Sequence, residues 1–191
     1  MEKYDQSKWI YIPKEDTEFR YVLGTVGENP LFVVGINPST AVPGKLDPTM
    51  KSVERIANGN GFDSYIMLNV YPQRATNPNE MDLKMNGTLH ENNLRVIEKV
   101  FQNSKGVPII WAAWGTNLVK RKYLKECLID LVKLSNRYQA KWCKVGKVSK
   151  DGHPHHPLYL KKDSKIEEFN IWEYINEGMR IDNGKKINKG K

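Results

Sequence analysis

The sequence lacks the features that define several common protein classes. It has two cysteines in 191 residues, Cys127 and Cys143, and they form no CxxC motif, so we expect two buried thiols rather than a disulfide or a cluster site. No apolar run approaches the ~18 residues of a membrane span. The first five residues have no apolar core and so do not resemble a secretory signal. We therefore expect a cytoplasmic protein with no membrane partner.

Positive charge is concentrated in one segment. The chain has a net charge of +8, and residues 120–150 alone hold ten Lys or Arg against two acids. Such a cluster is typical of a polyanion partner, here a nucleic acid or a nucleotide. The alternative is a solvated helix face followed by a lysine-rich strand edge. The candidate contacts to a nucleic-acid backbone are Lys120, Arg121, Lys122 and Lys125.

Apolar stretches alternate with amphipathic ones between residues 30 and 160. Strands are predicted at 31–36, 65–70, 107–113 and 141–148, with helices between them. Asp47 and Pro48 are typical of a helix start. Because the connections exceed ten residues, the strands are expected to be parallel. The predicted fold is a three-layer α/β/α domain with a central four-stranded, mainly parallel sheet and its first strand in the middle.

The rest of the chain is expected to add smaller elements. Residues 9–12 and 20–23 predict a β-hairpin within an N-terminal extension over 1–29. The run from Thr88 to Glu91 is a capping-box pattern, and Glu167 to Met179 predicts a last helix. The single α/β/α domain is placed at 30–180. Residues 181–191, rich in Gly, Asn and Lys, are expected to be a disordered basic tail.

Polar residues follow the predicted strands, which indicates one polar pocket. The carboxyl ends of parallel strands line a common crevice, where ligands bind. Gly35 permits close approach of the backbone to a ligand, and Pro38 stiffens the turn. Asn37 between them can orient a water but cannot take its proton. Alternatively, Asn37 and the following Ser39 bond only their own turn. Substrate contacts are also expected from Ile36 and Thr40.

The second predicted strand ends in a residue suited to a nucleobase. The carboxamide of Asn69 offers donors and an acceptor that match a base edge, although it could simply satisfy loose backbone. Tyr71 and Trp114 are candidates for stacking on a base, or else core residues. Arg74 is a candidate for a phosphate contact, or else solvated.

Three histidines, His153, His155 and His156, lie in one proline-containing loop. A metal-dependent hydrolase is one interpretation, but the spacing fits no zinc signature, so we expect no metal and no cofactor. His156 precedes Pro157 and an apolar segment, which is typical of one imidazole presented to a site. His153, in the same loop, is predicted to bind the substrate.

These motifs resemble those of the uracil-DNA glycosylase superfamily, particularly its mismatch-specific branch. The matching segments are Gly35 to Pro38, Ile66 to Val70, Ile109 to Gly115, and His156-Pro157, in the right order over about residues 30–160. The resemblance implies that Asn37 positions a water, Asn69 reads the base and His156 stabilises the leaving base. The chain departs from these enzymes at Ser39-Thr40, at Leu158 and in its lack of cluster cysteines.

The whole pattern resembles more closely a bacterial and phage family of unknown function, the domain-of-unknown-function family 1643. Its segments here include Gly35 to Thr40, Asp47 to Thr49 and Asp151 to Leu160. We therefore expect an N-glycosidic hydrolase acting on a nucleobase in DNA or on a free nucleotide, with Asn37 and His156 as its catalytic residues. A non-catalytic module that binds nucleotides or nucleic acid is the alternative, because Asn37 stands where a carboxylate would be a stronger base.

Overall fold

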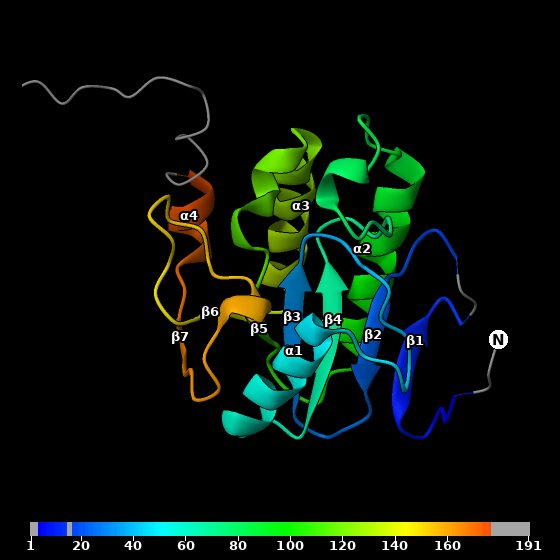
Figure 1. Ribbon diagram of the computed structural model, residues 1–191, viewed down its shortest axis with the longest axis vertical. Helices are drawn as coiled ribbons and strands as arrows, with labels where there is room; N and C mark the ends of the chain where they lie inside the picture. The colour runs from blue at the N-terminus through cyan, green and yellow to red at the C-terminus, as the bar shows by residue number, and fades with distance from the viewer. Residues whose placement is uncertain (1–3, 15–16, 177–191) are drawn as a thin grey trace, which may run out of the picture.

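Seven strands form one mixed sheet in the computed structural model, which describes residues 4–14 and 17–176 (Figure 1). The sheet order is β1-β2-β4-β3-β5-β6-β7. The strands are β1 (Trp9–Ile12), β2 (Val22–Thr25), β3 (Pro30–Gly35), β4 (Ser64–Asn69), β5 (Ile109–Ala112), β6 (Lys141–Val145) and β7 (Ile166–Glu168).

The four strands predicted from the apolar stretches make up the parallel centre of this sheet. Strand β3 pairs in parallel with β4 and β5, and β5 pairs in parallel with β6. The first predicted strand is therefore central, as expected. The last of the four is shorter than predicted, because Gly146 adopts a φ of +70° directly after β6.

The sheet has seven strands rather than the predicted four, because the N-terminal pair and a further strand join its edges. Strands β1 and β2 form the antiparallel pair expected near the N-terminus, and β2 also pairs with β4. Strand β7 adds to the other edge by pairing antiparallel with β6. Strand β7 was not predicted, because its three residues are too few to show a clear period in the sequence.

Four α-helices and three 3₁₀ turns accompany these strands in the described part of the chain. The helices are α1 (Pro48–Gly59), α2 (Gly87–Gln102), α3 (Tyr123–Arg137) and α4 (Ile171–Asn176). The 3₁₀ turns are η1 (Pro78–Glu80), η2 (Gly115–Lys120) and η3 (Pro157–Tyr159). In the described residues, no helix is both long and apolar enough to cross a membrane.

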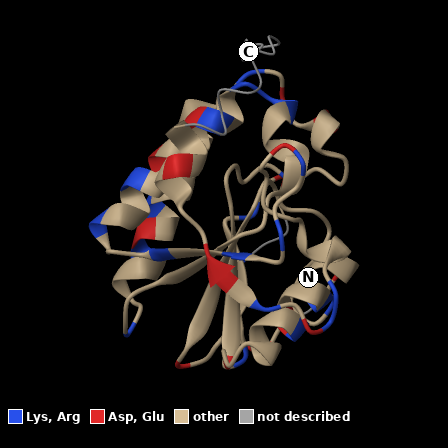
Figure 2. Cartoon of the chain, turned by 90° about the vertical axis from the view of Figure 1, so that its left-hand side faces the viewer, with Lys and Arg blue, Asp and Glu red and all other residues tan. Residues whose placement is uncertain are grey.

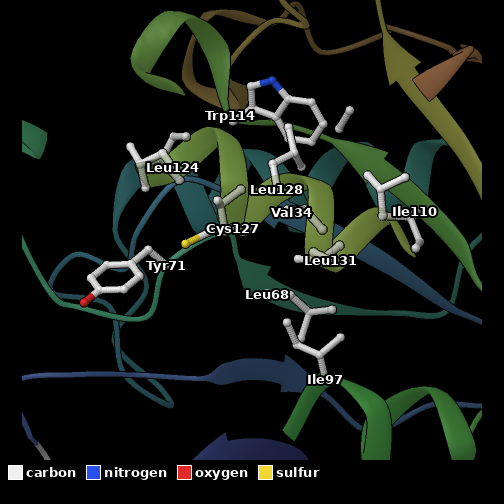
Figure 3. Close-up of a cluster of buried hydrophobic side chains, with 14 of the residues drawn as sticks. Val34, Leu68, Tyr71, Ile97, Ile110, Trp114, Leu124, Cys127, Leu128 and Leu131 are labelled. Carbon is white, nitrogen blue, oxygen red and sulfur yellow. The ribbon is translucent and has the colours of Figure 1, made fainter. Parts of the chain in front are cut away.

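The helices cover both faces of the sheet. Apolar residues of α1, such as Val53 and Ile56, share one buried cluster with Val33 and Met67. A second cluster on the other face joins α2 and α3 to the sheet. Figure 3 shows part of this cluster, including Val34 of β3, Ile97 of α2 and Leu131 of α3. The cysteines are unpaired and buried, as expected, with Cys127 in this second cluster and Cys143 in the first.

The start of α1 is the one predicted from the sequence. Asp47 is its N-cap, and the carboxylate accepts a hydrogen bond from the Met50 backbone N–H at 2.8 Å. Pro48 occupies the first turn, where no N–H partner is needed. This cap fixes the first turn of α1 at the carboxyl end of the sheet.

The start of α2 differs from the predicted capping box. The N-cap is Asn86, whose Oδ1 accepts from the Leu89 N–H at 3.0 Å, so Thr88 already lies inside the helix. We expect Asn86→Ala to lower the free energy of unfolding by about 1 kcal/mol. Thr88→Ala, a matched control in the same turn, should change it by less than about 0.5 kcal/mol. Urea denaturation of both variants measures the difference, and an equal loss in the two would contradict this assignment of the cap.

The C-terminal helix also begins later than predicted. Glu167 and Glu168 belong to β7, because they pair with Lys144 and Cys143 of β6, and the helix starts at Ile171. Tertiary pairing thus overrides the helical preference of two glutamates. Residues 177–179 of the predicted helix and the predicted tail at 181–191 lie outside the described residues.

Candidate functional site

A cavity of about 610 Å³ opens at the carboxyl ends of the parallel strands. Its walls come from the end of β3 and the following turn, the first turn of α1, the start of η2, and the loop before and through η3. The residues that line it are Arg20, Gly35, Ile36, Asn37, Ser39, Thr40, Asp47, Pro48, Thr49, Met50, Met67, Ala75, Thr76, Pro78, Trp114, Gly115, Thr116, Asn117, Ser149, Pro154, His155, His156, Leu158 and Tyr159.

Asn37 is held at the cavity wall by its own amide group. Its Nδ2 donates to the carbonyl of Ala75 at 2.7 Å and to that of Pro38 at 3.1 Å. With both N–H groups used in this way, the amide orientation is fixed and Oδ1 is the free acceptor. The amide group of Asn37 therefore does bond to backbone carbonyls, as in the alternative interpretation. The same bonds leave its Oδ1 available to a ligand or a water.

Asn69 lies at the end of β4, directly opposite Gly35 in the register. Its side chain is fully buried, and neither Nδ2 nor Oδ1 has a hydrogen-bond partner in the described part of the chain. A side chain at Gly35 would place its Cβ 3.3 Å from Asn69 Oδ1 and 2.6 Å from Met67 Cε. Met67 Cε fills the place that a Cβ of Gly35 would take, so Gly35 and Met67 together separate the Asn69 carboxamide from the cavity.

His156 is the N-cap of η3, and its Nδ1 accepts from the Leu158 N–H at 3.3 Å. A neutral imidazole that accepts at Nδ1 carries its proton on Nε2, which makes Nε2–H a donor. Burial lowers the pKa of His156 below its ordinary value, against a smaller raising effect of Asp47, so the neutral form is favoured. Gly115, at a φ of +62°, packs against this residue, because a Cβ there would lie 3.1 Å from His156 Cβ.

His153 does not line the cavity. It is buried, and its Nδ1 lies 2.7 Å from the hydroxyl of Tyr174, which also accepts from Trp114 Nε1 at 3.1 Å. Trp114 is fully buried but borders the cavity. Within the described residues, no three His, Cys, Asp or Glu side chains are grouped as metal ligands, so the three histidines do not form such a set.

Two other predicted ligand contacts are engaged inside the protein. Tyr71 is fully buried at the edge of the apolar cluster in Figure 3. It packs against Tyr123 at a ring distance of 5.0 Å and accepts a hydrogen bond from the Asn86 N–H. Arg74 donates to the carbonyl of Ser39 and to the hydroxyl of Tyr11. Neither side chain borders the cavity. The hydrogen bond from Arg74 to the Ser39 carbonyl stabilises the turn after β3.

The cavity thus brings together about half of the residues proposed from the sequence. Gly35, Ile36, Asn37, Ser39, Thr40, Trp114 and His156 line it. Pro38, Asn69, Tyr71, Arg74 and His153 do not. Asn37 and His156, predicted to act together, share its walls although they are far apart in the sequence.

Sequence reasoning missed two charged residues of the cavity. Asp47 was identified only as a helix cap, and Arg20 only as part of a strand. The helix-start pattern places Asp47 between a strand and the helix that follows it, on the side of the sheet where ligands bind. The sequence therefore contained enough information to predict Asp47 as a residue of the site. Arg20 carries no such signal, because its approach to the cavity depends on how β2 pairs with β4.

The four basic residues predicted to contact a nucleic-acid backbone differ in their surroundings. Arg121 donates to backbone carbonyls of Asn79, Met81 and Asp82, so it anchors the loop around η1. Lys120 and Lys122 are exposed and Lys125 is partly buried. Figure 2 shows acidic and basic segments alternating along the helices on the left of that view. Lys120 and Lys122 are therefore the accessible members of the predicted set.

Comparison with protein families gives one match. Residues 20–158 match the model of the family described as "Protein of unknown function (DUF1643)". The chain belongs to this family. No curated protein and no solved structure gives a significant match. The family match runs from Arg20 to Leu158, and every residue that lines the cavity except Tyr159 lies within it.

Proposed function

We propose that this DUF1643 protein is an N-glycosidic hydrolase that releases a nucleobase from DNA or from a free nucleotide. One observation carries the proposal: Asn37 and His156 line the same cavity, and each is fixed by a bond at one polar atom while another is left for a ligand. The fixed atoms are Nδ2 of Asn37 and Nδ1 of His156. The remaining ones are an acceptor, Oδ1, and a donor, Nε2–H.

Asn37 Oδ1 and His156 Nε2–H match the two groups on which hydrolysis of a glycosidic bond depends, the attacking water and the departing base. Cleavage of this bond passes through an oxocarbenium-like state, so the attacking water needs accurate placement more than a strong base. Asn37 Oδ1 would accept a hydrogen bond from that water. His156 Nε2–H would donate to the base as it departs with negative charge.

Asn69 would select the base. Its carboxamide is buried without partners behind Gly35, and an unpaired buried amide is costly unless a ligand completes its bonds. If the flexible Met67 side chain, which lines the cavity, moves away from Gly35, a nucleobase edge would pair with both the donor and the acceptor of Asn69. The resemblance of the motif order to that of uracil-DNA glycosylases also favours this role for Asn69.

A non-catalytic binding module is the second candidate, and Asp47 favours it. Asp47 is the single carboxylate that lines the cavity within the described residues, and it is occupied as the cap of α1. A pocket without a free general base suits binding as well as slow hydrolysis. If the partner is a nucleic acid, Lys120 and Lys122 would contact its backbone beyond η2.

Base release from a panel of substrates tests the proposal. The panel holds oligonucleotides with uracil, hypoxanthine or a thymine mismatch, together with free nucleotides, each incubated with excess protein and analysed by chromatography. We expect release from at least one member, and none from the Asn37→Ala variant. Tight binding without release across the panel would instead establish the binding module. Repeating the binding at two salt concentrations shows whether backbone phosphates contribute, since each contact adds about −0.7 to the salt slope for a single strand.

A further inference from the structure

Arg20 is a buried cation on the wall of the cavity. It lies two residues before β2, and only 2% of its surface is exposed. Its backbone N–H donates to the carbonyl of Pro72 at 2.9 Å, and Nη1 donates to the carbonyl of Ala41 at 2.8 Å. These bonds hold the guanidinium in place at the cavity.

The guanidinium keeps an unused donor. Its Nε has no hydrogen-bond partner, and no carboxylate forms an ion pair with Arg20 in the described ranges 4–14 and 17–176. Burying a charged group without a counter-ion carries a large desolvation cost. Accordingly, burial lowers the pKa of Arg20 to about 10, with a further lowering from the nearby Arg74. An arginine kept under these conditions is suited to receive an anion from outside the protein.

The charges around Arg20 leave the site positive. Arg74 adds a second guanidinium, while Asp47 and the hydroxyls of Tyr11 and Tyr65 have smaller opposing effects. The Asp47 carboxylate is itself bound to the first turn of α1. That turn also borders the cavity at Thr49, so a helix N-terminus and a buried guanidinium face the same space.

We propose that Arg20 forms a phosphate subsite, and that the ligand of this cavity is a free nucleotide whose terminal phosphate reaches it. The planar fork of arginine matches phosphate geometry, and a desolvated pair of this kind is stronger than one at the surface. The nucleotide part of this proposal rests on the proposed function, whereas the anion subsite rests on Arg20 alone.

The burial of Arg20 favours a small ligand over a DNA strand. Phosphates within a strand lie between sugars and approach a protein along its surface, where Lys120 and Lys122 are available. A residue with 2% exposure is reached only from inside the cavity. The volume of about 610 Å³ falls within the range of small-molecule sites, which is about 300–1,000 Å³.

Calorimetry on the full chain tests the subsite. Deoxynucleoside 5′-monophosphates, the matching nucleosides, inorganic phosphate and a single-stranded oligonucleotide are titrated into the wild type, Arg20→Met and Arg95→Met. Arg95 lies on α2 with its side chain 69% exposed, so its variant is a control for the loss of one positive charge. We expect at least one monophosphate to bind tenfold or more tightly than its nucleoside, with inorganic phosphate competing. In Arg20→Met, but not in Arg95→Met, this preference should fall to about onefold.

The possible outcomes distinguish a failure of the phosphate subsite from a failure of the proposed hydrolase activity. An unchanged preference in a folded Arg20→Met variant overturns the subsite, as does a wild type that binds monophosphate and nucleoside equally. The wild-type comparison decides the matter if Arg20→Met does not fold. Binding of the oligonucleotide through Arg20, without binding of monophosphates, overturns the free-nucleotide assignment. A phosphate preference that depends on Arg20, in a protein that releases no base, supports the subsite and counts against the hydrolase only.

Discussion

Replacing His156 with alanine is expected to lower kcat for base release by about 10²–10³-fold, or about 2.7–4 kcal/mol of transition-state stabilisation. The physical reason is the loss of the Nε2–H donor, which would stabilise negative charge on the departing base. Because that charge develops only in the transition state, KM should change much less than kcat. Single-turnover kinetics on the best substrate of the panel measures the effect.

His155→Ala is the matched control for this loss. His155 borders the same cavity and is the neighbour of His156 in the chain, but it has no role in the proposed mechanism. We expect its kcat to stay within about tenfold of the wild type. Equal losses in the two variants would show that the loop as a whole, and not one imidazole, matters for the reaction.

The pH dependence offers a second measure of His156. Since burial lowers the pKa of this imidazole, its neutral form persists below the ordinary value of 6.5. Protonation at Nδ1 would remove the acceptor for the Leu158 N–H and disturb η3. Activity should therefore fall on the acid side, with a midpoint below 6.5, and the His156→Ala variant should lack this transition. A midpoint above 6.5 would contradict the neutral donor.

The sequence predicted the parallel centre of the sheet because its strands are continuous apolar runs. Val33 and Leu68, for example, are both fully buried on opposite faces of such strands. The pair β1 and β2 was predicted as a hairpin, whereas the pairing of β2 with β4 and of β7 with β6 depends on residues distant in sequence. Glu167 and Glu168 show this most directly, since only contact with β6 makes them a strand.

The candidate site was predictable to the extent that it follows strand ends. Asn37 and His156 were identified because a polar residue after an apolar run marks such an end. Tyr71 follows the same rule but points into the core, since the direction of a side chain beyond a strand depends on packing. Arg20 could not be identified, because nothing in a sequence shows that a charged residue will be buried without a counter-ion.

Replacing Asn69 with leucine is expected to stabilise the ligand-free protein by about 1–3 kcal/mol and to abolish recognition of the base. The carboxamide is fully buried with both polar atoms unpaired, so an apolar side chain of similar size removes a desolvation cost. The same change removes the donor and the acceptor proposed to pair with the base edge. Urea denaturation measures the first effect, and base release or nucleotide binding measures the second.

Asn93→Leu is the control with the opposite expected sign. Asn93 is equally buried and its Oδ1 also lacks a partner, but its Nδ2 donates to the backbone carbonyl of Asn69 at 2.9 Å, whereas neither polar atom of the Asn69 side chain is bonded. Its loss leaves that carbonyl without this donor, so stability should fall by about 1–3 kcal/mol. A structural role for the Asn69 side chain predicts that both leucine variants are destabilised. A functional role predicts opposite signs, because a protein keeps an unpaired buried amide at a cost in stability when a ligand, and not the fold, completes its hydrogen bonds.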